Sequence, residues 1–262
     1  MSYLAWPKRK SGLLYCLTIV LYFGSIGLVR SADFEAGALA YSSGDFETAL
    51  QEWTPLAEGG NSYAQFLLGF MYNQGEGVPQ DHELALHWFT LAAEQGESAA
   101  QVSLGLMYDE GRGVPQDYEL TLHWYTLAAE QGHSDAQVSL ASMYNLGEDI
   151  PQDYELALLW YALAAEQGHI DAQLFLGSMY DQGKGVPEDD EIAVHWYTLA
   201  AEQGKREAQF FLGLMYSQGA GVPQDYIYAL MWLNIAADSG DSSMIEWRNS
   251  VASEMDQSQI QT

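Results

Sequence analysis

The sequence predicts an all-α protein, an elongated solenoid built from tandem helical hairpins. The stretch 100–132 recurs before and after itself at a constant spacing of 36 residues, and no insertion breaks the phase between residues 61 and 240. Each copy has two helical halves separated by a turn rich in glycine and proline. Self-similarity at this period is the signature of stacked repeats. One proline and one tryptophan per copy mark the register: Pro79, Pro115, Pro151, Pro187 and Pro223, and Trp88, Trp124, Trp160, Trp196 and Trp232.

The first half of the unit 97–132 predicts a helix. Ala100, Leu104 and Met107 are spaced so that they share one helical face. Ser98 and Gln101 stand three residues apart, as in a capping box, where each side chain satisfies a free backbone donor. We therefore expect Ser98 to be the N-cap of this helix.

The second half predicts another helix. Residues 111–115 stop the first helix, because their glycines allow positive φ and proline cannot continue the hydrogen-bond ladder. Asp117 is suited to cap the helix that follows. Leu120, Trp124 and Leu127 give that helix an apolar face.

Such a hairpin has two apolar faces and cannot bury both by itself, so it must pack against the next copy. We expect the large Trp and Tyr side chains to fill the space between layers. Small residues should mark the places where two helices approach closely. They recur at one position of the first helix: Gly69, Gly105, Ala141, Gly177 and Gly213.

The repeated pattern A-Q-x-x-L-G-x-M-Y-x-x-G-x-G-V-P-Q-D-Y-x-x-A-x-x-W-Y-x-x-A-A-E-Q-G resembles the Sel-one-like repeat, a branch of the tetratricopeptide superfamily. The resemblance covers residues 61–240 in five units. It implies a right-handed superhelix whose first helices line a concave surface, and a role as an adaptor in protein–protein interaction. Departures are mild: Asp149 replaces a loop glycine, Ala141 a packing glycine, and residues 233–235 an aromatic run.

Residues 1–31 have the pattern of a secretory signal peptide. Lys8, Arg9 and Lys10 precede an apolar run, and no acidic residue occurs before Asp33. Cleavage after Ser31 would place the repeats outside the cytoplasm, in the periplasm or secreted. The alternative is an uncleaved membrane anchor formed by residues 13–29, a run at the short edge of a membrane span.

The two ends of the remaining chain differ from the five repeats. Residues 32–60 predict a degenerate hairpin that caps the N-terminal end of the stack. Residues 241–262 predict a C-terminal capping helix followed by a frayed polar tail.

The chain is strongly acidic, with 9 basic and 36 acidic residues and a formal net charge of −27. Four of the basic residues lie within residues 1–31, so the rest carries 5 − 36 = −31. This charge disfavours nucleic acids and anionic membranes and favours a basic protein or peptide, or divalent cations. The alternative is that the acids serve only solubility.

No motif predicts catalysis, a cofactor or a metal site. His87, His123 and His195 share one repeat position, but neighbouring copies lie too far apart to share an ion. The acidic run 188–191 lacks the spacing of a calcium loop. We therefore expect no enzyme. Relatives with disulfide-bridged repeats suggest β-lactam hydrolysis as one alternative, which the absence of cysteine after residue 31 weakens. A structural component of envelope assembly is the other.

The resemblance to tetratricopeptide-like repeats implies a concave lining of mixed apolar and acidic character, suited to a peptide or protein partner. The candidate binding residues are Tyr63, Phe66, Phe70, Asn73, Val102, Leu106, Asp109, Val138, Ser142, Asn145, Leu174, Ser178, Asp181, Phe210, Leu214 and Ser217.

Overall fold

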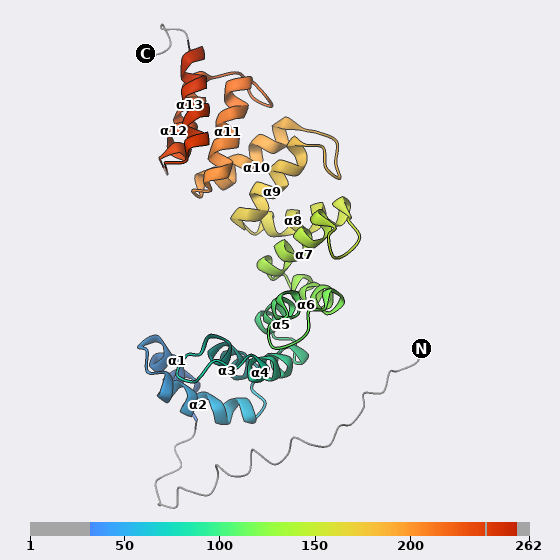
Figure 1. Ribbon diagram of the computed structural model, residues 1–262, viewed down its shortest axis with the longest axis vertical. Helices are drawn as coiled ribbons and strands as arrows, with labels where there is room; N and C mark the ends of the chain where they lie inside the picture. Colours follow the sequence, from blue (N-terminus) through green and yellow to red (C-terminus); the bar gives the residue numbers. More distant parts are fainter. Residues whose placement is uncertain (1–31, 239, 256–262) are drawn as a thin grey trace, which may run out of the picture.

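The fold is given by a computed structural model that describes residues 32–238 and 240–255 (Figure 1). These residues form thirteen α-helices and no strand, which confirms the all-α prediction. The proposed signal or anchor and the polar tail from residue 256 lie outside the described residues. The helices are α1 (Phe34–Ser42), α2 (Phe46–Glu58), α3 (Ser62–Gln74), α4 (His82–Glu94), α5 (Ser98–Glu110), α6 (Tyr118–Glu130), α7 (Ser134–Leu146), α8 (Tyr154–Glu166), α9 (Ile170–Asp181), α10 (Asp190–Glu202), α11 (Arg206–Gln218), α12 (Tyr226–Ala237) and α13 (Ser242–Glu254).

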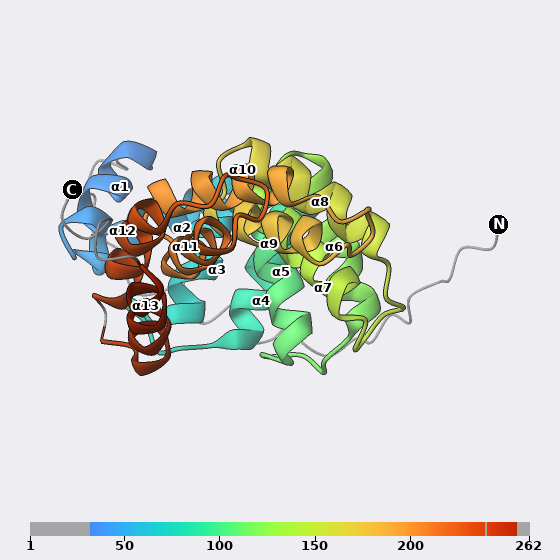
Figure 2. The same ribbon diagram turned by 90° about the horizontal axis from the view of Figure 1, so that it is seen from above.

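The helices stack as a solenoid. The extensive contacts all join helices that are consecutive in the chain, so no central core gathers distant segments. The stack follows a long arc in Figure 1, and Figure 2 shows the same arc from above, with successive layers overlapping in the view. Stability in such an arrangement is close to a sum over units and their interfaces.

The expected capping box is wrong. Glu97, not Ser98, is the N-cap of α5, and Ser98 is the first helical residue. Gln101 is buried and its side-chain amide donates to the Ala93 carbonyl of the preceding helix at 3.2 Å. Carbonyls in the last turn of a helix lack intrahelical donors, and the glutamine supplies one.

The same interaction recurs along the stack and forms what we call the glutamine ladder. Gln65, in α3, donates to the Ala57 carbonyl of α2 at 2.9 Å and accepts a hydrogen bond from Gln95, at the end of α4, at 2.7 Å. One buried side chain thus joins three consecutive helices. Because a buried polar group without a partner is costly, the ladder fixes the position of each helix against the next. Its other members are Gln101, Gln137, Gln173 and Gln209, and the donors to the first three of these are Gln131, Gln167 and Gln203.

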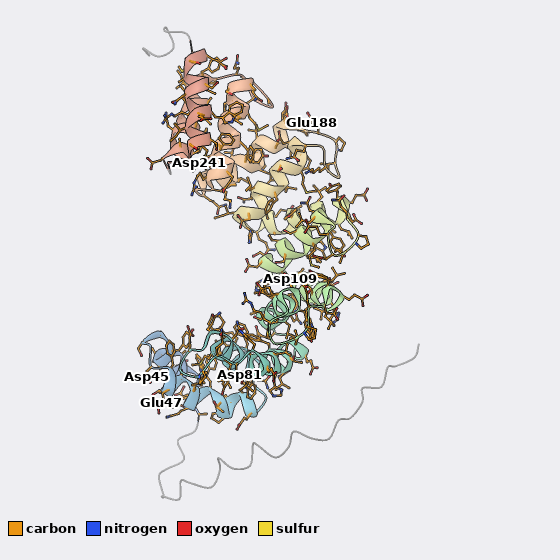
Figure 3. The ribbon with its side chains drawn as sticks, viewed as in Figure 1. Asp45, Glu47, Asp81, Asp109, Glu188 and Asp241 are labelled. Atoms are coloured by element: carbon orange, nitrogen blue, oxygen red, sulfur yellow. The ribbon has the colours of Figure 1, made fainter. Side chains whose placement is uncertain are left out.

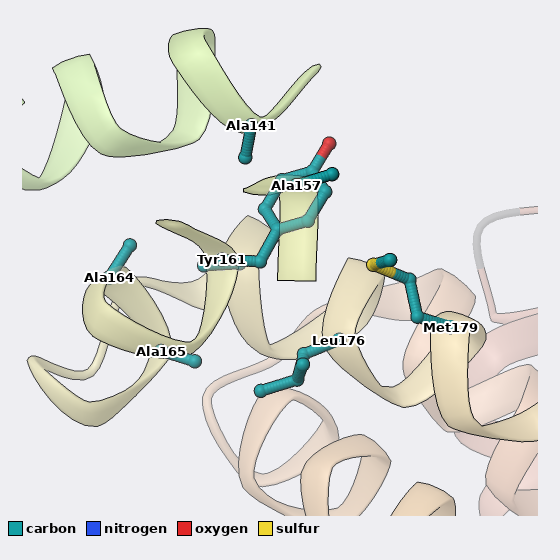
Figure 4. Packing of buried hydrophobic residues seen from close by; sticks show 8 residues of the cluster. Ala141, Ala157, Tyr161, Ala164, Ala165, Leu176 and Met179 are labelled. Atoms are coloured by element: carbon teal, nitrogen blue, oxygen red, sulfur yellow. The ribbon is translucent and has the colours of Figure 1, made fainter. Parts of the chain in front are cut away.

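The interior of each layer is filled by the residue that follows the repeated tryptophan. Tyr161 is 1% exposed and packs among alanines, Leu176 and Met179 (Figure 4), whereas Trp160 is half-buried at the edge of the same cluster. Trp88 and Trp124 are also half-buried and pack against the cores of the layers before them. The buried side chains at the interior position are Trp53, Phe89, Tyr125, Tyr161, Tyr197 and Leu233.

The recurring small residues lie against these buried side chains, as the sequence predicted. A Cβ atom added to Gly69 would lie 2.6 Å from the ring of Phe89, and one added to Gly105 would lie 2.5 Å from the ring of Tyr125. Real Cβ atoms do not approach other atoms so closely, so the two helices of a hairpin are in direct contact here. Ala141 takes this position in the third unit and belongs to the same buried cluster as Tyr161.

The turn within each hairpin depends on glycine and on an aspartate that caps the following helix. Gly111 and Gly113 have φ of 69° and 71°, which only glycine adopts readily. After the turn, Asp117 caps α6 by accepting from the backbone N–H groups of Glu119 and Leu120. No other described residue except glycine has positive φ, so Asp149 cannot reproduce the backbone of Gly113, its equivalent.

The last helix of the described residues is α13. It packs against α12, with Val251 buried beside Ala229 and Leu233. The equivalent helix of the preceding repeat, 36 residues earlier, is α11. It carries the buried Leu212 and Gly213, and Gly213 lies directly against Leu233 of α12, the second helix of that repeat. In α13 these positions are Arg248 and Asn249. No second helix follows α13 in the described residues, and the two positions that would receive one are polar.

The burial pattern predicts which aromatic residue stabilises a layer most. Tyr161→Ala should lower the free energy of unfolding by about 3–5 kcal/mol, because it leaves a cavity at a fully packed position. Trp160→Ala, the matched control, should cost clearly less because its ring is half-buried. Urea denaturation of both variants measures this, and an equal or larger loss for Trp160→Ala would contradict the assignment.

Candidate protein-binding surface

The predicted binding residues come from the first helix of each repeat: α3, α5, α7, α9 and α11. Figure 3 shows one of them, Asp109, at the junction between the α5 and α7 layers. Tyr63 and Leu106 are exposed, at 47% and 40%. Twelve others are half-buried: Phe66, Phe70, Asn73, Val102, Asp109, Val138, Ser142, Asn145, Ser178, Asp181, Phe210 and Leu214.

Two of the predicted residues are not available to a partner. Leu174 and Ser217 are each only 8% exposed. Leu174 belongs to the core cluster of the α10 layer, and the Ser217 hydroxyl donates to the Leu214 carbonyl at 2.7 Å. The Leu174 side chain packs into the following layer and cannot contact a partner. We remove both residues from the candidate surface.

Two aromatic residues that the sequence analysis missed lie at the surface beside it. Phe175 packs against Tyr161 with tilted rings whose centroids are 5.2 Å apart, and Phe211 stacks over Tyr197 with ring centroids 5.3 Å apart. They are 39% and 36% exposed. Both occupy the same repeat position, one residue away from the spacing on which the prediction was based. A search for exposed aromatics at any repeat position would have found them.

A hollow of about 390 Å³ lies between α5 and α7, and we call it the α5–α7 hollow. Its lining includes four predicted residues, Leu106, Asp109, Val138 and Ser142, which the fold brings together from two repeats. The buried ring of Tyr125 also lines it. The remaining lining residues are Ser139, Met143, Leu146, Glu148, Asp149 and Ile150.

The α5–α7 hollow is acidic. Three carboxylates line it, from Asp109, Glu148 and Asp149, and its lining contains no lysine, arginine or histidine. Burial, and then the nearby Glu110 and Asp149, raise the pKa of the Asp109 carboxyl above its ordinary value. A cation in the hollow would relieve this repulsion.

A related environment occurs two repeats later. Burial, followed by the charges of Asp190 and Glu188, raises the pKa of Asp181, the equivalent of Asp109. The acidic character of the first helices therefore extends beyond the α5–α7 hollow.

The comparisons with known proteins agree with this architecture. The Sel1 repeat family matches five consecutive segments, residues 62–97, 98–133, 134–169, 170–205 and 206–241. The chain belongs to the Sel1 repeat family. Sel1 repeats are generally scaffolds for protein–protein interaction rather than catalysts, which agrees with the coarse expectation from the sequence.

Two solved Sel1 repeat structures are similar over most of the chain. A Sel1 repeat protein from Oxalobacter formigenes is 36% identical, with a TM-score of 0.77, over 82% of this chain and 88% of that one. A protective antigen of uropathogenic Escherichia coli with the same fold is 38% identical, also with a TM-score of 0.77, over 80% of this chain but 46% of its own. A comparison with curated proteins finds no match.

The structure adds nothing in favour of metal chemistry at the repeated histidines. His87, His123 and His195 are exposed, and each ring lies edge-on to the following tryptophan. Among residues 32–238 and 240–255, no three His, Cys, Asp or Glu side chains are grouped so that they could hold a metal ion.

The raised pKa of Asp109 predicts a pH-dependent effect on stability. A carboxyl that ionises less readily in the folded protein destabilises the fold once the pH is above both its unfolded and its folded pKa. Asp109→Asn should therefore raise Tm at about pH 7, and the gain should vanish near pH 3, where the carboxyl is protonated in both states.

Thermal unfolding followed by circular dichroism at the two pH values checks this. Glu119→Gln, a change of the same kind at an exposed position in the first turn of α6, serves as the control and should give no gain. A lower Tm for Asp109→Asn at neutral pH would show that the charge is not a cost to the fold.

Proposed function

We propose that this Sel1 repeat protein is an exported scaffold that binds a basic protein or peptide segment along the inner face of α3, α5, α7, α9 and α11. The observation that carries the proposal is the combination, on these helices, of exposed apolar side chains with acids that have no ion-pair partner among the described residues. Leu106, Phe175 and Phe211 offer apolar contact, and Asp109 and Asp181 offer negative charge.

Charge supports the choice of a basic partner. Only five basic residues follow residue 31. Lys205 forms an ion pair with Asp171 at 2.7 Å, and Arg112 pairs with Glu110. The cations of the chain therefore neutralise little of its acidic surface. Electrostatic attraction of this kind accelerates association and selects partners of opposite charge.

A binding face of this kind predicts where a partner can be captured. A photo-crosslinking amino acid placed at Leu106, Ser178 or Leu214 should form a covalent adduct with the partner in the native cell. The same group at His123, Leu159 or His195, which are exposed on the second helices, should not. Adduct formation should fall when a basic peptide is added in excess.

Mass spectrometry of the adducts tests this prediction and identifies the partner. Capture from the second helices in preference to the first would place the binding face elsewhere and overturn the proposal.

Export rests on the sequence of residues 1–31. Within the described residues, no helix is sufficiently long and apolar to span a bilayer. If the signal is cleaved after Ser31, the intact mass of the purified mature protein should correspond to a chain that begins at Ala32. The change Lys8→Glu, Arg9→Glu, Lys10→Glu should prevent processing, because the positive n-region is required for signal recognition. A full-length chain recovered in the membrane fraction would instead support the anchor.

A further inference from the structure

The α5–α7 hollow exists because one aromatic side chain of the repeat is missing. At the two later junctions, Phe175 covers Tyr161 and Phe211 covers Tyr197. Thirty-six residues before Phe175, the residue is Ser139, which lines the hollow and is hydrogen-bonded to the Tyr125 hydroxyl. Tyr125 is consequently 5% exposed, whereas Tyr161 and Tyr197 are each 1% exposed.

The preceding junction, between α3 and α5, compensates for the same loss. Its residue at this position is Ser103. There, however, Phe66 and Phe70 of α3 pack against the core that contains Phe89. At the α5–α7 junction the positions of Phe66 and Phe70 are held by the smaller Val102 and Leu106. These smaller side chains do not replace the two phenylalanine rings, and the space beside Tyr125 remains open.

The rim of the hollow is also particular to this junction. The turn after α7 carries Glu148-Asp149-Ile150 where the turn after α5 carries Arg112-Gly113-Val114. Glu148 and Asp149 are exposed, and Asp149 accepts a hydrogen bond from the Tyr118 hydroxyl. Compared with the turn after α5, the turn after α7 therefore has two acids in place of a cation and a glycine, and these acids lie beside the half-buried Asp109.

We propose that the α5–α7 hollow is the anchor site for one lysine or arginine side chain of the bound segment. This inference rests on the proposed function and specifies it. The aliphatic stem would lie over Tyr125, between Leu106, Val138 and Met143, where a phenylalanine ring lies at the later junctions. The charged head would reach the carboxylates of the rim, as long cationic side chains do when their stems are buried.

The size and charge of the hollow favour this occupant. A volume of about 390 Å³ leaves ample room for one long side chain. An apolar side chain would leave Asp109, Glu148 and Asp149 unneutralised, and an acidic one would be repelled by them. A side chain that is apolar along its length and cationic at its tip satisfies both parts of the lining.

The decisive variant is Ser139→Phe. It restores the residue found at the two later junctions, so the fold accepts it by internal precedent, and it fills the hollow. Ser103→Phe, the same change at the neighbouring junction, is the matched control. Glu148→Gln with Asp149→Asn removes the rim charge without changing shape, and Glu119→Gln with Glu155→Gln removes the same charge from exposed positions on α6 and α8.

The probe is a short fluorescent peptide of alternating lysine and leucine, with an arginine–leucine peptide and a glutamate–leucine peptide for comparison. Fluorescence anisotropy with the purified protein should show that both basic peptides bind and the acidic one does not. Ser139→Phe should raise Kd at least about tenfold, as expected for loss of a central anchor. Glu148→Gln with Asp149→Asn should also weaken binding and reduce its salt dependence. Both controls should bind as the unchanged protein does.

Several results would overturn the anchor site: unchanged affinity in Ser139→Phe, equal weakening in Ser103→Phe, equal binding of the acidic peptide, or no binding of either basic peptide. Thermal unfolding of each variant separates loss of the site from loss of the fold. If the anchor fails while crosslinking from the inner face persists, the proposed function stands with a different contact. If inner-face crosslinking fails as well, both proposals fall.

Discussion

Each hairpin of this solenoid closes because one residue of its first helix has almost no side chain. At Gly105 the ring of Tyr125 lies so close that even a methyl group would collide with it. In this hairpin the distance between the paired helices is therefore set by the thickness of an aromatic ring against bare backbone. Since the second helix also forms the interface with the next layer, this contact determines the geometry of the whole stack.

Polar interactions then fix the layers that this contact brings together. A buried glutamine in each first helix satisfies a carbonyl of the helix before it, and the first four of these accept from the end of the helix after them, as Gln101 does with Ala93 and Gln131. Apolar packing tolerates small rotations, but a hydrogen bond from a buried amide to one particular carbonyl does not. Packing thus stabilises the solenoid, and the glutamine ladder defines the register in which the layers meet.

The sequence predicted the architecture well because the period repeats five times. It predicted the glycine contacts and the order of helices, yet it misplaced one buried side chain and did not distinguish two others. Gln101 was assigned to its own helix because local spacing cannot reveal a partner in another layer. The sequence assigned Trp and Tyr side chains alike to the space between layers, because Trp160 and Tyr161 lie on one broad apolar face, and only the packed layers show that Tyr161 is the one that points inward.

The candidate surface was predictable only in part, because repeat spacing identifies equivalent positions but does not show which of them are buried. Repeat spacing brought Leu106 and Val138 to one hollow, but it also included Leu174, which is buried. The hollow itself results from a missing ring at Ser139, and its meaning emerges only by comparison with Phe175 and Phe211. Variation between copies, more than the shared pattern, therefore distinguishes a possible binding site from the scaffold that holds it.

The polar residues of α13 have a consequence for how separate molecules behave. Any repeat with a bare apolar end could accept the first hairpin of a second copy, and nothing in the interface would limit the number of copies that follow. Arg248 and Asn249 stand where such a junction would need Leu and Gly. They remove from this helix the apolar contact through which such open-ended growth would proceed.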